Sequence, residues 1–282
     1  MIQQQWLTAS ILDDIGDFFK GEPIFKMACD LFNTVIELIY SLLGVNPTAG
    51  SYEKVWDIVQ NLYTVFSAIG APLVVIFFVY GYCRDAVDIK AELQMEATIK
   101  MFIRMIMAVT LMEGVIHWLP RLFGWAMKLL GVTEASTFSL DSKAISKSLA
   151  DSQVLLVGFI MGIIFLLIVV AASVIMIWTC LGRFLNLYII TPFGSIALAT
   201  IAAGGQVAQT AYAYIKNMLL YTFEIVPMGL VLAITPAFLQ GSSITDSGSD
   251  GFLVLVEAIV KILVIASGLK GAETVIKKAT NL

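Results

Sequence analysis

The sequence has few charges. Charged residues make up 13% of the 282 residues and hydrophobic residues 59%, whereas ordinary globular domains contain about 25% charged residues. Residues 152–215 contain a single charge, Arg183, between uncharged stretches of 31 and 32 residues. Each stretch exceeds the roughly 20 apolar residues that span a hydrocarbon core. This scarcity of charge excludes a soluble fold and predicts an integral membrane protein.

The sequence also lacks the motifs of common enzymes. Its one histidine cannot form an HExxH zinc site, and neither a GxxxxGK[ST] phosphate loop nor a GxSxG elbow occurs. Its three cysteines (Cys29, Cys83, Cys180) are far apart, so we expect buried thiols rather than metal ligands. We predict no catalytic residue, metal or cofactor. The net charge of −4 gives no overall basic field for nucleic acid, although a local ring of basic residues in an oligomer stays open.

Residues 1–50 are predicted to form amphipathic N-terminal helices, over 1–20 and 24–44. In the second, polar residues recur every three or four positions, which places them on one helical face. These are Lys26, Asp30, Asn33, Thr34, Glu37 and Ser41. We expect this helix to lie at the membrane surface or to pack on neighbouring helices. A surface helix of a soluble domain is the alternative.

Residues 51–282 are predicted to form an all-α, polytopic transmembrane helix bundle. The apolar segments are 58–83, 99–119, 153–181, 216–240 and 252–269. A polar loop is expected at 132–152, and a short basic tail follows the last span.

The segment 184–203 is apolar but broken near its middle by Pro192 and Gly194. It is either a kinked span or a re-entrant hairpin of two half-helices. The number of spans is therefore five or six. The distribution of Lys and Arg favours six spans with an inside N-terminus, and both alternatives place the C-terminus inside.

Ionisable residues within apolar segments are candidates for functional sites. Glu113 and His117 lie one turn apart, as do Glu257 and Lys261, whose spacing also fits a structural ion pair. Glu224 has no cation near it in sequence, so it is the best candidate for lining an aqueous conduit or pairing with Arg183.

Residues 182–238 resemble the core of the TrbL/VirB-type polytopic channel subunits of type IV secretion and conjugation machines. The similarity lies in Arg183 after a long apolar span, the break at Pro192 and Gly194, a small-residue turn with Gly and Gln, and a further span. Residues 97–131 resemble the basic-then-apolar entry helix of that family. The similarity extends over residues 58–270 and is one of pattern, and the chain lacks the large soluble extension of many relatives.

This resemblance implies a five-span core with an outside N-terminus in the inner (cytoplasmic) membrane. It implies a homo-oligomeric channel or scaffold that helps DNA or protein cross that membrane, with transient contact to the substrate. The implied partners are other copies, membrane lipid and other secretion subunits, including ATPases. A small-molecule secondary transporter and a purely structural membrane scaffold are the alternatives.

Overall fold

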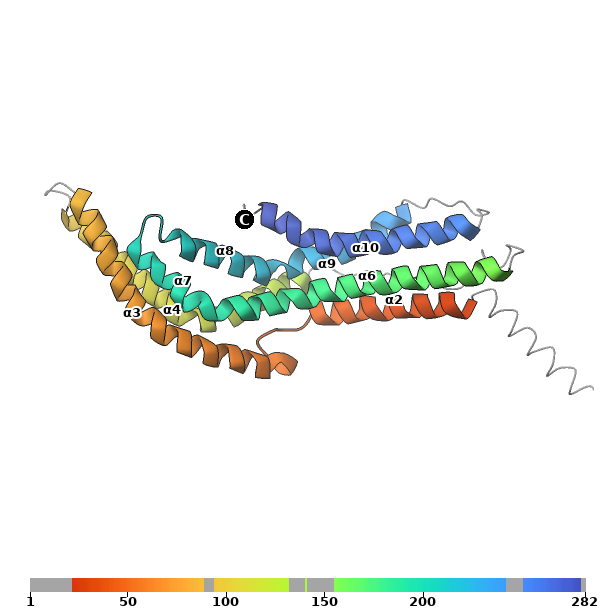
Figure 1. Ribbon diagram of the computed structural model, residues 1–282, viewed down its shortest axis with the longest axis horizontal. Helices are drawn as coiled ribbons and strands as arrows, with labels where there is room; N and C mark the ends of the chain where they lie inside the picture. The colour runs from red at the N-terminus through yellow and green to blue at the C-terminus, as the bar shows by residue number, and fades with distance from the viewer. Residues whose placement is uncertain (1–21, 89–93, 132–139, 141–154, 242–250, 280–282) are drawn as a thin grey trace, which may run out of the picture. The chain divides into compact units, whose positions relative to one another are not determined.

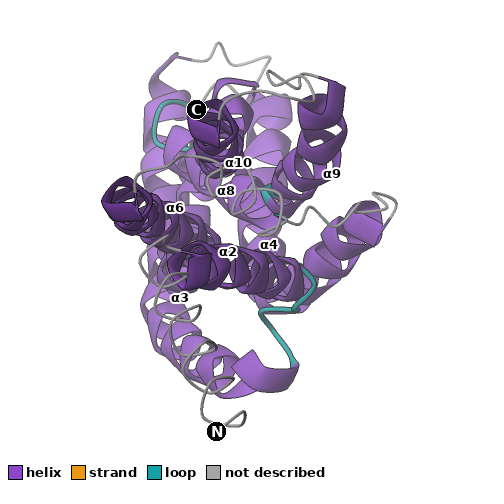
Figure 2. Cartoon of the chain, turned by 90° about the vertical axis from the view of Figure 1, so that its right-hand side faces the viewer, coloured by secondary structure: helices purple, strands orange, loops and turns teal. Residues whose placement is uncertain are grey.

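A computed structural model describes residues 22–88, 94–131, 140, 155–241 and 251–279. Within these ranges every regular element is a helix (Figures 1 and 2). The α-helices are α2 (Glu22–Leu43), α3 (Glu53–Asp88), α4 (Gln94–Gly131), α6 (Leu155–Ile190), α7 (Gly194–Ala199), α8 (Gln209–Phe223), α9 (Ile225–Gly241) and α10 (Gly251–Ala279). Short 3₁₀ helices are η1 (Gly50–Tyr52), η3 (Thr191–Phe193) and η4 (Thr200–Ala203). The all-α prediction is confirmed for this part of the chain.

Four helical stretches among the described residues are long and apolar enough to cross a membrane. They are Gly50–Asp85, Gly158–Ala203, Gln209–Leu239 and Phe252–Lys278. Their lengths and compositions are those of an integral membrane protein. The predicted span 99–119, within α4, is not one of the four, and the number of crossings stays a prediction.

The chain forms two compact units, each built from separated stretches of sequence. Unit 1 contains the described residues of 1–43, 133–180 and 228–273, and unit 2 contains those of 44–132, 181–227 and 274–282. The predicted division of the chain near residue 50 stays a prediction. The predicted helix 1–20 lies outside the described residues, and so does the loop 132–152 apart from Leu140.

In unit 1, α2 has the predicted amphipathic pattern. Its apolar side chains are buried, Phe25, Phe32 and Ile39 completely, while Lys26 and Glu37 are exposed. Burial of an apolar stripe is what stabilises such a helix in a protein. The prediction of a helix over 24–44 is therefore confirmed. The observed helix begins two residues earlier, at Glu22, and ends one residue earlier, at Leu43.

Side-chain packing holds α2 in unit 1. The ring centroids of Phe25 and Phe165 in α6 are 5.7 Å apart. The Tyr40 hydroxyl donates a hydrogen bond to the Leu232 carbonyl oxygen in α9 (3.3 Å). Burial raises the pKa of this phenol above its ordinary value of 10.0, so it stays a donor. Asn33 exchanges two hydrogen bonds with the backbone of Leu140 (2.9 and 3.2 Å).

In unit 2, α3, α4, α7 and α8 pack around one apolar core (Figure 1). Backbones approach closely at two glycines of α3. A Cβ atom on Gly70 would lie 2.9 Å from the Ser195 carbonyl oxygen, and one on Gly81 would lie 2.7 Å from that of Ala203. Small residues allow such contacts between membrane helices, where dispersion forces replace the hydrophobic effect.

Residues 184–205 run alongside α3 in the same direction. Phe184 stacks on Tyr52 (5.5 Å between centroids), and Phe193 meets Phe66 (4.9 Å). Ser195 then meets Gly70 and Ala203 meets Gly81. The chain reverses only at Gly204 and Gly205, which have φ angles of 63° and 56°.

The chain therefore does not turn back at Pro192 and Gly194, as the re-entrant alternative required. Ile190, Phe193 and Gly194 all have right-handed helical dihedrals, so η3 continues the direction of α6. Pro192 lacks an N–H and interrupts the α-helical hydrogen bonds, and a tighter 3₁₀ turn takes their place. The backbone is therefore kinked rather than reversed, and it continues from α6, so that residues 158–203 form one candidate span and the six-span count stays a prediction.

Candidate functional site

A polar cluster of unit 2 lies where α3, α4 and the Gly204–Gly205 turn meet. Asp85 accepts hydrogen bonds from Arg84 Nη2 (2.7 Å) and Nε (2.9 Å) on one oxygen and from Arg104 Nη1 (3.3 Å) on the other. Arg84 Nη1 also donates to the Gly204 carbonyl oxygen (3.3 Å). One carboxylate thus holds two guanidinium groups in fixed positions.

Gly204 and Gly205 are needed for two reasons, the positive φ angles of the turn and the arginine side chains that lie against it. A positive φ costs other residues about 1–3 kcal/mol. A Cβ atom on Gly204 would also collide with the guanidinium of Arg104, and one on Gly205 with that of Arg84. The turn is therefore built to accept two arginine side chains against its backbone.

This cluster keeps an excess positive charge at the surface. About a third of each arginine side chain is exposed (34%), against 25% for Asp85. Ion pairs with this exposure contribute only about 0–1 kcal/mol each. Since each guanidinium has five donors, several stay available for anionic groups such as phosphates or carboxylates.

Of the predicted site residues, Arg183 and Glu224 both lie in unit 2 and both are buried, with exposed fractions of 4% and 2%. The Arg183 guanidinium lies 4.5 Å from the ring centroid of Phe184, a cation–π distance. Each of the two residues has a further interaction within the structure. Whether they pair with each other stays a prediction.

Glu257 and Lys261 form the predicted ion pair on α10, with Oε1 and Nζ 2.6 Å apart. The Glu257 side chain is only 9% exposed and that of Lys261 25%. The charges are therefore balanced within one helix of unit 1, as the i,i+4 spacing indicated.

Glu113 and His117 are both exposed on α4. They differ in this from Glu224, whose side chain is buried.

Among the cysteines, Cys83 is exposed, while Cys29 and Cys180 are buried, so the expectation of three buried thiols is wrong at Cys83. Within the described part of the chain, His, Cys, Asp and Glu side chains form no group of three that could hold a metal ion.

The polar atoms at the break of residues 190–200 are satisfied locally. The Thr191 hydroxyl donates to the Leu187 carbonyl oxygen (2.7 Å), and the Thr191 carbonyl oxygen accepts from the Tyr214 hydroxyl (3.3 Å). The Thr200 hydroxyl donates to the Ala197 carbonyl oxygen (2.6 Å). Gly194 leaves the space that the Tyr214 hydroxyl occupies. The polar groups of the broken segment are thus bonded within the protein and not free to bind a substrate.

These features define the class of the protein as an integral membrane helix bundle with buried charges and a surface arginine cluster. Comparison of the chain with protein-family models, with curated proteins and with solved structures gives no significant match. The resemblance to type IV secretion subunits stays a prediction.

The arginine cluster was missed from the sequence. In the sequence Arg84 and Arg104 are only basic residues at span ends, and Arg104 lies one turn from Lys100. In the structure Lys100 instead pairs with Glu96 (2.7 Å). Two features of the sequence pointed to the cluster. An Arg–Asp dipeptide follows one apolar segment directly and a Gly–Gly dipeptide follows another, but nothing in the sequence shows that the two dipeptides lie together.

Proposed function

We propose that the chain is a channel or scaffold subunit of a type IV secretion or conjugation machine in the inner (cytoplasmic) membrane. Several copies would assemble there with other subunits of the machine, including its ATPases. The substrate, DNA or protein, would pass along surfaces formed between copies. The proposal rests on the sequence resemblance of residues 182–238 and on three structural observations.

The main support is the enclosed break at Pro192 and Gly194. Secondary transporters bind their substrates at unwound helices whose freed backbone groups face a cavity. Here the neighbouring carbonyl and hydroxyl groups bond to each other, and residues 198–204 are buried. A break whose polar groups are already bonded fits a wall component better than a carrier.

The outer face of α3 supports assembly from several copies. Ile58, Val65, Ile69 and Val75 are each at least half exposed along this helix. Only 17% of the residues in its most apolar stretch are buried within the protein. Such a surface meets either lipid or another helix, and helix association in membranes depends on close packing of this kind.

The Arg84–Asp85–Arg104 cluster suits contact with an acidic substrate. In a symmetric assembly it would repeat once per copy and form a ring of positive charge. Such rings select and steer anions at pore mouths. DNA phosphates and acidic protein segments are anions of this type.

A small-molecule transporter is the second candidate, because Glu224 and Glu257 are buried carboxylates in apolar helices. Carriers use such groups for proton or ion coupling. The Glu257–Lys261 pair argues against this use of Glu257, since its charge is already balanced.

The proposal is tested by deleting the gene in its own host and complementing it from a plasmid. We expect DNA transfer to recipients, or secretion of the machine's protein substrate, to be lost on deletion and restored by the wild-type gene. The Arg84→Gln/Arg104→Gln variant should reduce transfer, while Arg84→Lys/Arg104→Lys, which keeps the charge, should restore part of it.

Membrane levels of each variant are compared by immunoblot as the control. Normal transfer by the deletion strain would refute the secretion role. Loss of uptake or export of a small solute, with transfer intact, would favour the carrier.

A further inference from the structure

We propose that unit 2 holds an acyl chain of a membrane phospholipid in a cavity between α4, α7 and α8, with the lipid phosphate at Arg121. This inference requires only that the protein lies in a membrane, so it is independent of the secretion role.

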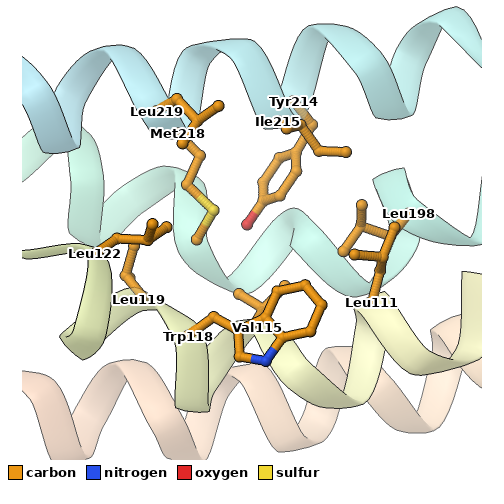
Figure 3. Close-up of a pocket in the computed structure, with 10 residues that line it drawn as sticks. All are labelled: Leu111, Val115, Trp118, Leu119, Leu122, Leu198, Tyr214, Ile215, Met218 and Leu219. Carbon is orange, nitrogen blue, oxygen red and sulfur yellow. The ribbon is translucent and has the colours of Figure 1, made fainter.

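The cavity has a volume of about 250 Å³. Leu111 and Val115 of α4 form one side, Leu198 of α7 forms another, and Tyr214 and Met218 point into it from α8 (Figure 3). Two of the three elements belong to stretches apolar enough to cross a membrane. The surrounding bilayer therefore supplies acyl chains at high local concentration.

The lining offers nothing to a polar ligand. Its side chains are aliphatic or aromatic apart from two polar atoms, the Tyr214 hydroxyl and the Trp118 indole nitrogen. The Tyr214 hydroxyl is already committed to the Thr191 carbonyl oxygen (3.3 Å). Water needs two to four polar partners, whereas an apolar cavity of about 150 Å³ binds benzene. By that comparison this cavity holds roughly ten carbon atoms of an acyl chain.

The indole of Trp118 forms the edge of the cavity. A Cβ atom on Gly114, one turn earlier in α4, would lie 3.1 Å from Trp118 Cε2. The absence of that atom lets the indole fold back along α4 and line the cavity. Trp118 is nevertheless 43% exposed, so the cavity reaches the surface of the protein at this side chain.

Arg121 places a cation one turn beyond this edge. Residues 118, 121 and 125 share one face of α4, and Trp118, Arg121 and Trp125 are all exposed. Tryptophans favour the level of the lipid headgroups, and an arginine guanidinium binds phosphate through two parallel hydrogen bonds. An apolar cavity next to such a cation matches the two ends of a phospholipid.

The experiment measures lipid retention by native mass spectrometry. The full chain is reconstituted in nanodiscs of phosphatidylglycerol and released into mild detergent, and the spectra give retained lipids and copies of the chain per particle. The variants Val115→Phe and Leu219→Trp add bulk to the cavity. We expect the wild type to retain one lipid that both variants retain about tenfold less well.

Ile106→Phe is the control, because Ile106 is an exposed residue of α4 that does not line the cavity. Leu219 is itself 38% exposed, so its variant should fold even if the buried Val115 does not accept a larger side chain. Arg121→Gln should lower retention of phosphatidylglycerol without changing the cavity.

Equal lipid retention by wild type and both cavity variants would overturn the site. So would a loss of copies per particle at unchanged lipid retention, which would mean that a second copy of the chain fills the cavity. Equal retention by wild type and Arg121→Gln would overturn the assignment of the phosphate to Arg121.

Discussion

The two units of this protein join their helices in different ways. Unit 1 uses large side chains, such as Phe25 against Phe165, and an amphipathic helix whose apolar face is buried. Unit 2 brings backbones together at Gly70 and Gly81 of α3, where the carbonyl oxygens of Ser195 and Ala203 are the nearest atoms. Side chains in the first kind of contact can shift, whereas backbones in the second cannot. Unit 2 should therefore tolerate substitution at its contacts less well.

The units also differ in how they balance charge. The Glu257–Lys261 pair of unit 1 lies within one helix, four residues apart. The Arg84–Asp85–Arg104 cluster of unit 2 joins three elements, including a turn 120 residues away from Arg84 along the chain. The first arrangement follows from local spacing, and the second exists only after the fold has formed.

The largest effect is expected in a labelling experiment that tests whether residues 184–205 run from one face of the membrane to the other. With the native cysteines replaced by serine, Gly182→Cys and Gln206→Cys should be labelled by an impermeant thiol reagent from opposite faces of the membrane. The reason is that Phe184 and Gly204 lie at opposite ends of α3. Gly182 has space for a side chain and Gln206 is exposed. Labelling of both from one face would restore the re-entrant hairpin.

The next largest effect is expected at Glu224. A buried carboxylate at apolar depth costs several kcal/mol unless it is paired, hydrated or protonated, so Glu224→Leu should lower substrate transfer at least about tenfold at normal membrane levels. Glu224→Gln keeps the shape and should have a smaller effect. Glu113→Leu, at an exposed position of α4, is the control. Wild-type transfer by Glu224→Leu would make the residue dispensable.

Gly81→Ala tests the backbone contact of unit 2 directly. The added Cβ atom would meet the Ala203 carbonyl oxygen, and overpacking of this kind costs about 1–3 kcal/mol. In unit 1, a Cβ atom on Gly162 would lie 3.4 Å from the Ile24 side chain, an ordinary contact. We expect thermal unfolding in detergent to show a lower Tm for Gly81→Ala and an unchanged or higher Tm for Gly162→Ala. The reverse order would contradict the distinction between the units.

Gly204→Ala compares two glycines with positive φ angles. Gly50 has a φ of 68° with open space around it, whereas Gly204 faces the Arg104 guanidinium. Gly50→Ala and Gly204→Ala each introduce backbone strain of about 1–3 kcal/mol. Only Gly204→Ala also displaces an arginine side chain. The Tm of Gly204→Ala should therefore be the lower one. Equal Tm values would show that the arginine moves aside at no cost.

The smallest effects are expected for the two ion pairs of identical spacing. Glu257→Gln should lower the Tm by about 2–4 °C, since loss of a buried charged partner costs about 1 kcal/mol or more. Glu96→Gln should cause no measurable change at neutral pH, because both side chains of the Glu96–Lys100 pair are mostly exposed. The hydrogen bond from Lys100 lowers the pKa of Glu96 below its ordinary 4.5. Its small contribution is present above about pH 4.5 and is lost as the pH falls through the lowered pKa.

Features set by local spacing could be predicted from the sequence. The helix over 24–44 followed from its polar periodicity, the Glu257–Lys261 pair from its i,i+4 spacing, and the interruption at Pro192 from the missing N–H. The direction of the chain after Pro192 could not be predicted, because a proline allows both a kink and a reversal. It depends on the contacts that Gly70 and Gly81 make with residues far along the chain.

The glycine contacts of α3 also set an order of events during synthesis. At about 5–20 residues per second, the 120 residues between Arg84 and Gly204 take roughly 6–24 s to appear. Over most of that time α3 has been made, whereas residues 195–203, which contact its Gly70 and Gly81 in the folded protein, have not. The two backbone contacts of α3 can therefore form only after the chain has been made as far as Ala203, so the core of unit 2 closes late in synthesis.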